Sequence, residues 1–382
     1  MRRYLPRSSF VLAALIIALG LTGRATVARP AAAAPVAAPA YAVTDLGTLG
    51  GESPFGASTY AEANNDAGQV VGYSVTAAGE EHAFLWDDGQ MTDLGTLGGA
   101  SSFALDINTA GQVVGHSTTA DGAQHAFLWD DGQMTDLGAL GGGSTQAFAI
   151  NDAGQVVGQA VPGDGRAPAF LWGDGQMTDL GTLGGGASIA KDINEAGQVV
   201  GNADAADGTQ HAFLWEQGMM SDLGTLGGAL SYAETIDEAG RVGGTAETAD
   251  GTSHAFLWEQ GTMTDLGTLV GTKGNSGTLG MNDAGQVVGA SDTTGGGSAF
   301  LWSAGAMTDL NDVLQPDGGW VIDYVTDIND DGQIVGQGTV DDGNSGGIVL
   351  TPDGDSTDVG TPGASVGVQV ASEAKVTYPV GK

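Results

Sequence analysis

The sequence has no cysteine and few positive charges, with 11 lysines and arginines against 46 aspartates and glutamates in 382 residues. The absence of cysteine excludes disulfide bonds and an anchor attached to a lipid-modified cysteine. Binding of phosphate groups needs clustered lysine and arginine side chains, which this chain does not offer. Nucleic acids and anionic lipid surfaces are therefore excluded as partners.

Long hydrophobic runs are also missing. The longest, Phe10–Leu21, has twelve residues, whereas a helix needs about 20 to cross a bilayer. It follows the basic residues Arg2, Arg3 and Arg7 and precedes an Ala/Pro-rich stretch, which is the pattern of a signal peptide. We therefore predict that residues 1–40 are a signal peptide and Ala/Pro-rich segment. The mature chain is then secreted, extracellular or periplasmic, without a membrane span, and its formal charge changes from −35 to −40 because five arginines are lost.

No stretch after residue 41 has the apolar spacing of a long helix. Instead, the tetrapeptide Ala-Phe-Leu-Trp recurs at intervals of 43 residues four times and then 44. A second phrase, close to Asn-Asp-Ala-Gly-Gln-Val-Val-Gly, occurs in seven versions, with glycines from Gly68 to Gly332. The chain after residue 41 is therefore an array of seven units.

Each unit reads as four short strands. In the second unit they are Phe103–Ile107, Gln112–Gly115, His125–Trp129 and Met134–Gly138. Short turns rich in Asp and Gly join strands as antiparallel hairpins. A repeat of about 40–45 residues with four strands is typical of a β-propeller blade. We predict an all-β fold, a seven-bladed β-propeller built from four-stranded repeats of about 43 residues, with a β-solenoid as the alternative.

The third strand of each unit has two apolar faces. Its alternation puts Ala83 and Leu85 on one face, and His82, Phe84 and Trp86 on the other. A small-residue face on one sheet can receive the bulky face of the next sheet. We therefore predict that the repeated aromatic residues form the core between blades: Trp86, Trp129, Trp172, Trp215, Trp258, Trp302, Phe84, Phe127, Phe170, Phe213, Phe256 and Phe300.

The two ends of the array are unequal. Tyr41–Leu49 carries the fourth-strand phrase without the three strands before it, and the last unit loses its pattern after Pro352. We predict that Val43–Leu46 pairs with Ile348–Leu350 and closes the ring, with Ser356–Val359 as the rival closing strand. The propeller then spans residues 41–360, and residues 361–382 form a C-terminal tail.

The repeated phrases HAFLW, INDAGQVVG and TDLGTLGG resemble those of the HAF family of probable extracellular repeat proteins. The resemblance covers roughly residues 41–352 and includes the Asn311–Trp320 insertion and the Leu-Thr-Pro ending of the last unit. It implies export and a repeat-built β fold, and it brings no catalytic residues. Pro168 and Ser298 depart from the pattern, because histidine stands at their position in four other units.

Two repeated features invite a metal-site interpretation. Asp327, Asn329 and Asp331 have the spacing that begins a calcium loop, but the twelfth position is Gly338. Asn, Asp and Gly also favour tight turns, so we interpret the segment as a turn, with calcium binding as the alternative. The four repeated histidines belong to four different units, which would keep them apart, and no cofactor is predicted.

The aspartate of Thr-Asp-Leu-Gly recurs in every unit, so we expect it to accept hydrogen bonds from backbone N–H groups near the strand end. No nucleophile motif, phosphate-binding loop or arginine cluster is present. We therefore predict a monomeric, non-enzymatic secreted protein that binds or scaffolds an extracellular protein or polysaccharide. A polysaccharide-active hydrolase or lyase, or a lectin, is the alternative.

Residues that break the repeat are the candidates for function. These are Arg166, Lys191, Arg241, Lys273 and Trp320, the tryptophan outside the repeated tetrapeptide. Random variation between units is the alternative explanation for them.

Overall fold

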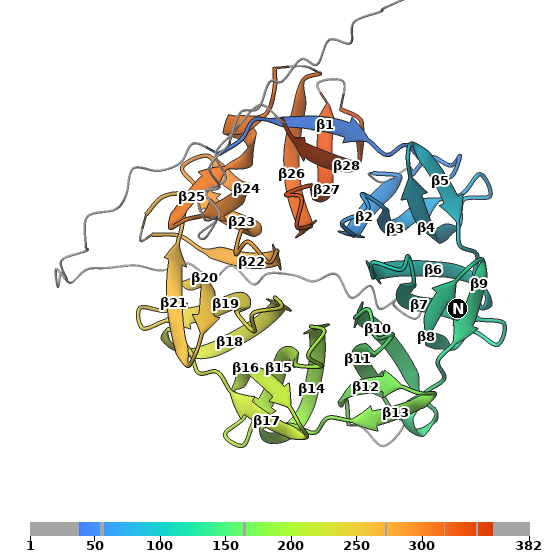
Figure 1. The fold of residues 1–382 in the computed structure, drawn as a ribbon, viewed down its shortest axis with the longest axis horizontal. Helices are drawn as coiled ribbons and strands as arrows, with labels where there is room; N and C mark the ends of the chain where they lie inside the picture. Colours follow the sequence, from blue (N-terminus) through green and yellow to red (C-terminus); the bar gives the residue numbers. More distant parts are fainter. Residues whose placement is uncertain are drawn as a thin grey trace, which may run out of the picture.

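The computed structural model describes residues 38–53, 57–162, 166–271, 273–316, 318–340 and 343–353. These residues form seven four-stranded antiparallel sheets, which stand as blades around one axis (Figure 1). The predicted seven-bladed β-propeller is therefore confirmed. The predicted signal peptide and C-terminal tail lie outside the described residues, apart from residues 38–40, and so does the rival closing strand.

Each blade has an innermost, a second, a third and an outermost strand, and blades one to seven are numbered by their innermost strands in chain order (Figure 1). The innermost strands are β2 (Thr59–Asn64), β6 (Gly98–Ile107), β10 (Ser144–Ile150), β14 (Gly184–Ile193), β18 (Gly227–Ile236), β22 (Ser276–Met281) and β26 (Trp320–Ile328). The second strands are β3 (Val70–Val75), β7 (Val113–Thr119), β11 (Val156–Val161), β15 (Val199–Ala205), β19 (Val242–Thr248), β23 (Val287–Thr293) and β27 (Ile334–Val340). The third strands are β4 (Glu81–Asp87), β8 (Gln124–Asp130), β12 (Ala169–Gly173), β16 (Gln210–Glu216), β20 (Ser253–Glu259), β24 (Gly296–Ser303) and β28 (Ser345–Pro352). The outermost strands are β5 (Gln90–Asp93), β9 (Gln133–Asp136), β13 (Gln176–Asp179), β17 (Met219–Asp222), β21 (Thr262–Gly267), β25 (Ala306–Asp309) and, for blade seven, β1 (Tyr41–Asp45).

Two short 3-10 helices interrupt the β structure, η1 (Leu140–Gly142) and η2 (Leu310–Val313). η2 opens the insertion that precedes blade seven. Asn311 fixes this insertion to β26, because its Oδ1 accepts the N–H of Ile322 at 2.8 Å and its Nδ2 donates to the Ile322 carbonyl at 3.2 Å. No helix within the described residues is long and apolar enough to cross a membrane.

The hairpin between the third and outermost strands depends on positive φ angles. In blade one, Asp88 and Gly89 have φ of 50° and 83°, which is the conformation of the tight turn that matches the twist of paired strands. Asp and Gly tolerate this conformation better than most residues. The repeated Asp-Gly pair therefore sets the register of β4 against β5.

The last glycine of the repeated Gln-Val-Val-Gly phrase permits a bulge in the innermost strand. At Gly115, an added Cβ would lie 1.9 Å from the carbonyl oxygen of Phe103. The register of β6 against β7 shifts between Ala104 and Asp106 at the same place. An extra residue is thereby accommodated in the innermost strand, and its side chain is redirected, as bulges do.

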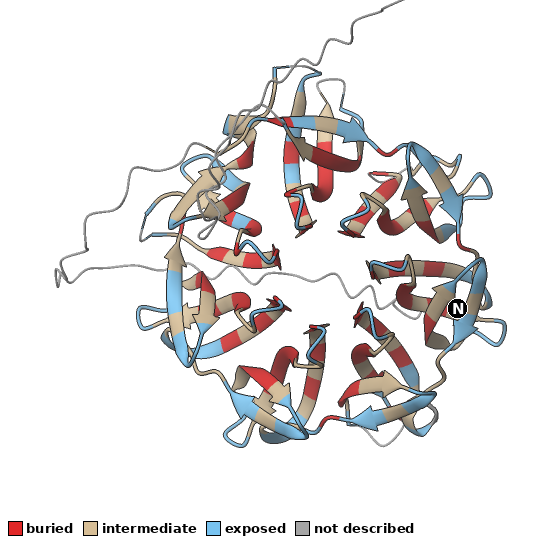
Figure 2. Cartoon of the chain, in the orientation of Figure 1, coloured by how far each residue is buried: buried red, intermediate tan, exposed pale blue. Residues whose placement is uncertain are grey.

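Each pair of adjacent blades shares a hydrophobic cluster. Between blades one and two, Ala83 and Leu85 of β4 pack against Phe127 and Trp129 of β8. The same small-on-bulky arrangement recurs around the ring, and Figure 2 shows the buried residues concentrated in the inner strands of each blade. The predicted stacking of faces is therefore observed.

The repeated phenylalanines are the centre of these clusters and the tryptophans lie at their margin. The fully buried residues, each 0% exposed, are Phe84, Phe127, Phe170, Phe213, Phe256 and Phe300. The tryptophans are half-buried and pack against the clusters from the side: Trp86, Trp129, Trp172, Trp215, Trp258 and Trp302. The expectation that the tryptophans are buried between blades was therefore wrong in degree. Trp86 is the last residue but one of β4, close to the turn that leads into β5, so part of its ring reaches the molecular surface.

The ring is closed by the N-terminal strand. β1 pairs antiparallel with β28, with Val43 opposite Leu350, Thr44 opposite Val349 and Asp45 opposite Ile348. Tyr41 is 1% exposed within the cluster between blades six and seven. The predicted pairing is confirmed, and blade seven is built from both ends of the propeller, which leaves no blade with a missing outer strand.

Candidate functional site

The repeated asparagine of the inner turn forms a ring around the axis. The positions of this turn-end ring are Asn65, Asn108, Asn151, Asn194, Asp237, Asn282 and Asn329. Each asparagine Nδ2 donates to the backbone carbonyl of the equivalent residue in the next blade at 2.9–3.1 Å, and Asn329 closes the circle onto Asn65. All of these residues are buried, so their polar groups serve the architecture.

Blade five departs from the ring and compensates for it. Asp237 cannot donate as an asparagine does, and the usual glutamine four residues later is Arg241. The Arg241 guanidinium pairs with the buried Asp237 carboxylate and donates to the Asp283 carbonyl of blade six at 2.9 Å. Arg241, one of the candidates for function, therefore supplies the missing link of the turn-end ring.

The calcium candidates lie at the end of β26 and in the turn that follows it. The Asp327 carboxylate accepts the N–H of Asn64 at 3.2 Å, and Asn329 Oδ1 accepts the N–H of Gln333 at 2.8 Å. Asp331 is exposed. Side-chain oxygens of Asp327 and Asn329 therefore accept backbone N–H groups, as the turn interpretation requires. No group of three His, Asp or Glu residues within the described ranges is placed to hold a metal ion.

The aspartate of each Thr-Asp-Leu-Gly phrase accepts a backbone N–H two residues later at 2.7–3.0 Å, as expected. These residues are Asp45, Asp93, Asp136, Asp179, Asp222, Asp265 and Asp309. Four of them also bind the repeated histidine, with Nδ1 to carboxylate distances of 2.7–2.9 Å. The histidines therefore have structural partners on the neighbouring strand.

Three blades lack this histidine, and two of them replace its hydrogen bond, whereas blade seven has Gly346 at the position. In blade three, where Pro168 stands at its position, Arg166 donates to Asp179 at 3.2 Å. In blade six, the Ser298 hydroxyl donates to Asp309 at 2.7 Å. Arg166, a second candidate for function, thus contacts the same carboxylate as the histidines do.

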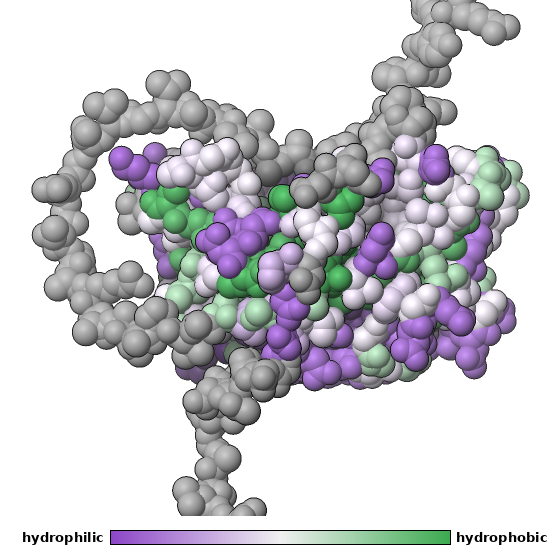
Figure 3. All heavy atoms as spheres, turned by 90° about the horizontal axis from the view of Figure 1, so that it is seen from above, coloured by the Kyte–Doolittle hydropathy of each residue, from purple (hydrophilic) through white to green (hydrophobic). Residues whose placement is uncertain are grey.

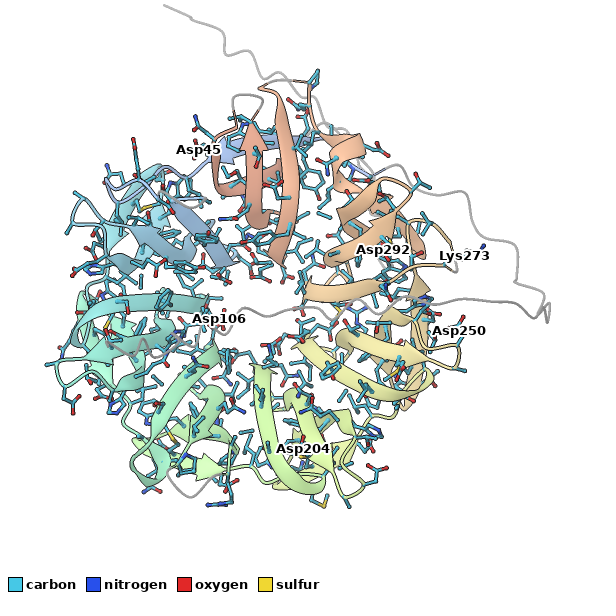
Figure 4. The ribbon with its side chains drawn as sticks, turned by 180° about the vertical axis from the view of Figure 1, so that it is seen from behind. Asp45, Asp106, Asp204, Asp250, Lys273 and Asp292 are labelled. Carbon is cyan, nitrogen blue, oxygen red and sulfur yellow. The ribbon has the colours of Figure 1, made fainter. Side chains whose placement is uncertain are left out.

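The other non-repeated candidates lie far apart on the ring. Lys191, on innermost strand β14, lies 3.1 Å from the Glu234 carboxylate and 5.3 Å above the centre of the Phe148 ring. Lys273 is exposed at the outside of the molecule (Figure 4). Trp320 is half-buried against the core of blade seven. The structure does not bring these three residues together.

Three aspartates occupy equivalent positions on innermost strands. Asp106 of blade two accepts the N–H of Ile107 and, across the interface, that of Ile150, both at 2.8 Å. Asp192 and Asp327 bind the next blade in the same way. The pKa of Asp106 is raised to about 8, mainly by burial and in smaller part by the nearby Asp192 and Asp327 carboxylates. Figure 4 shows Asp106 at the inner edge of its blade, whereas Asp45 lies at the outer edge of blade seven.

At the other end of the innermost strands lies a group of rings that no repeat contains in full. We call it the axial aromatic cluster: Tyr60, Tyr73, Phe103, His116 and Tyr324. Tyr60 stacks on Tyr73 with ring centroids 4.7 Å apart, Tyr73 meets Phe103 edge-on at 4.9 Å, and Phe103 stacks on His116 at 5.0 Å. Tyr60 is five residues before Asn65, about 16 Å along an extended strand, which separates the cluster from the turn-end ring.

Glu62 lies beside these tyrosines. Burial raises the pKa of Glu62 to about 7. Burial also raises the pKa of Tyr73 and of Tyr324, and the Glu62 carboxyl raises both further, which places it near both hydroxyls. None of the hydrogen bonds found among the described residues reaches the Glu62 carboxylate or the hydroxyls of Tyr60, Tyr73 and Tyr324. These four groups therefore differ from the repeated polar side chains, which have hydrogen-bond partners within the fold.

Sequence reasoning missed this cluster because it sought breaks in charge and in tryptophan placement. The signal lay in two columns of the repeat. One column reads Tyr60, Phe103, Gln146, Ile189, Tyr232, Gly277 and Tyr324, and the other reads Tyr73, His116, Gln159, Asn202, Thr245, Ala290 and Gln337. Rings fill the first column in the consecutive blades seven, one and two, and the second column in blades one and two. Comparison of the columns across the seven units would have located the cluster.

No protein-family model matches the chain, and no curated protein matches its sequence. Among solved structures, it is similar to the β-propeller domain of the trilobed protease from Pyrococcus furiosus, with 10% identity and a TM-score of 0.54 over 78% of this chain and 97% of that one. It is also similar to a puromycin-hydrolysing peptidase from Mycobacterium tuberculosis, with 12% identity and a TM-score of 0.52 over 82% of this chain and 56% of that one. The protease domain has an open velcro topology, whereas β1 closes the last blade here. At these identities the likeness concerns the fold, and it places the chain among β-propellers.

Proposed function

We propose that this chain is an exported, non-enzymatic binding propeller of the HAF type, and that it takes its ligand at the axial aromatic cluster. The observation that carries the proposal is a contrast in hydrogen bonding. Asn65, His82 and Asp93, as examples of the repeated polar residues, have partners within the fold. The tyrosine hydroxyls of the cluster and the Glu62 carboxylate have none among the described residues, so they are available to a ligand.

The surface elsewhere supports a site at the axis. The exposed large hydrophobic residues of the described ranges are Val161, Met219, Leu230 and Val321, which belong to four different blades. Figure 3 shows the rim beside blade seven with hydrophilic and hydrophobic residues intermingled. A broad apolar docking face, which marks many protein partners, is not favoured by this distribution.

Export is supported by the N-terminal sequence. The basic residues, the short apolar run and the Ala/Pro-rich stretch precede β1 directly. We propose that the propeller acts outside the cell or in the periplasm, where its acidic surface would keep it soluble. Detection of the protein in the culture medium or the periplasmic fraction, with its N-terminus near residue 41, would test this part of the proposal.

The binding function is tested by a ligand screen with matched variants. The mature chain is screened by thermal shift against neutral and anionic oligosaccharides, acidic and basic peptides, and small amines. Tyr60→Leu is compared with Tyr232→Leu, which alters the equivalent strand position in blade five. We expect a stabilising ligand whose effect is lost in Tyr60→Leu and kept in Tyr232→Leu. Equal loss in both variants, or no stabilising ligand, would contradict the proposal.

An enzyme remains the second candidate because of Glu62. A carboxyl with a pKa of about 7 is suited to general acid–base catalysis near neutral pH. Product formation from any oligosaccharide or peptide in the same panel, abolished by Glu62→Gln, would favour the enzyme over the binding protein.

A further inference from the structure

The sector around the axial aromatic cluster contains no lysine or arginine. Blades seven, one and two include the described residues 41–53, 57–136, 320–340 and 343–353, and the first basic side chain after residue 41 is Arg166. Lys191, the basic residue on an innermost strand, is already paired with Glu234 between blades four and five. His116 of the cluster is neutral at physiological pH, because burial lowers its pKa to about 4.

Acidic groups surround the same rings. Besides Glu62, the carboxyl of Glu81 lies near Tyr60 and Tyr73, and that of Asp323 lies near Tyr324. An anionic ligand would meet repulsion from all three carboxyls and find no cation to pair with. Electrostatics therefore excludes the acidic ligand classes from this site.

The rings themselves offer a surface to a cation. Tyr73 is held between Tyr60 on one side and Phe103 on the other. No further ring of the described chain covers the outer face of Tyr60, and this residue is half-buried. The negative face of an aromatic ring attracts a cation within about 6 Å of its centroid, most strongly where water is partly excluded. A carboxylate beside such a face adds a charge partner.

We infer that the axial aromatic cluster binds a small organic cation, an alkylammonium group held against Tyr60 and Tyr324 with Glu62 as its counter-charge. This inference rests on the proposed binding function and names the chemical class of its ligand. A cation can pair with the Glu62 carboxylate and contact the face of the tyrosine ring at the same time. A neutral polar ligand would leave the Glu62 carboxylate, which is half-buried, without a charge partner.

The test uses three probes of similar shape titrated into the mature chain: n-butylammonium, neutral n-butanol and anionic butyrate. Binding is followed by NMR shifts of the tyrosine rings at constant ionic strength. We expect n-butylammonium to bind at least about tenfold more tightly than either of the others, since a partly desolvated cation–π contact with a charge partner contributes that much.

Repeat symmetry supplies the control variants. Glu62→Gln should weaken binding of n-butylammonium at least about tenfold. Glu234→Gln changes the equivalent position in blade five, where the carboxylate already pairs with Lys191, and should leave binding unchanged. Thermal unfolding of each variant shows whether it is folded, and Glu62→Asp provides a second variant that keeps the charge if Glu62→Gln fails to fold.

The outcomes separate this inference from the proposed function. The inference that the ligand is a cation would be overturned if butanol or butyrate bound as tightly as n-butylammonium. It would also be overturned if Glu62→Gln and Glu234→Gln weakened the binding of n-butylammonium equally. A neutral saccharide whose binding is lost in Tyr60→Leu would also overturn the inference of a cationic ligand, but it would support the proposed binding function. If no ligand bound to the cluster, both the proposed binding function and the inferred ligand class would be contradicted.

Discussion

The two ends of the propeller axis are built by opposite rules. At the turn end, asparagine repeats in six of seven blades and joins each of them to the next blade, and Arg241 supplies the seventh link of the circle. At the other end, rings from blades seven, one and two gather without a repeat, and their polar atoms lack partners in the described chain. A repeated polar residue in such an array stabilises the ring, and a ligand site is to be sought where the repeat is broken and hydrogen-bonding groups remain unused.

Blade five refines this comparison, because a break in the repeat does not by itself indicate a ligand site. Asp237 and Arg241 both depart from the repeat, and together they restore a link to the next blade. The same holds for Arg166, which contacts the aspartate that histidine binds elsewhere. Whether the polar atoms of a departing residue have partners therefore distinguishes compensation from function.

The largest expected effect concerns closure of the ring, on which both ends of the axis depend. Deletion of residues 1–46 removes β1 and exposes the edge of β28, including the cluster that holds Tyr41. We expect this variant to unfold at a much lower temperature than a variant that lacks residues 1–37 and keeps β1. Thermal unfolding by circular dichroism compares the two, and equal midpoints would mean that blade seven is stable with three strands.

The second effect separates the two aromatic residues of the repeated tetrapeptide. Phe170→Ala removes a side chain that is 0% exposed and should cost about 3–5 kcal/mol in the free energy of unfolding. Trp172→Ala, at the half-buried margin of the same cluster, should cost less. Urea unfolding of both variants gives the order, and a larger loss at Trp172 would show that the margin of the interface contributes more than its centre.

The sequence predicts what depends on period and alternation. Seven units, four strands in each, the packing of Ala83 and Leu85 against the next blade, and the pairing of Val43 with Leu350 all follow from the pattern of the repeat. The partial exposure of Trp86 does not follow from this pattern. Alternation shows which face of the strand a side chain lies on, but it does not show how close that side chain is to the end of the blade.

The candidate site depends on contacts between blades, which a single repeat cannot reveal. The turn-end ring forms because Asn65 lies beside Asn108 across an interface, whereas the sequence shows only a turn residue. Tyr324 and Tyr60 are far apart in the chain and become neighbours because the ring closes. Their proximity could be expected only after closure had been assumed and the equivalent positions of the blades compared.

The third effect tests the compensation in blade five. Arg241→Gln leaves the Asp237 carboxylate, whose side chain is 0% exposed, without its cation and should cost about 3 kcal/mol. The double variant Asp237→Asn with Arg241→Gln recreates the residues of the other blades and should recover most of that loss. A double-mutant cycle in urea measures the coupling, and additive losses would show that the pair does not stand in for the asparagine link.

The smallest effect concerns the half-buried aspartates near the turn end of the innermost strands. The folded protein holds the proton of Asp106 up to about pH 8, whereas the unfolded chain releases it near the ordinary value of 3.8. Between these pH values the folded state binds more protons, so this group lowers stability as pH rises. We expect the unfolding midpoint to fall by a few degrees from pH 5 to pH 9, and to fall less in Asp106→Ala. His254, whose pKa is raised by its hydrogen bond to the Asp265 carboxylate, contributes in the same direction, but Asp106→Ala retains it, so the difference in slope reports on the removal of Asp106. Parallel pH profiles for the two proteins would show that the proton on Asp106 has no part in stability.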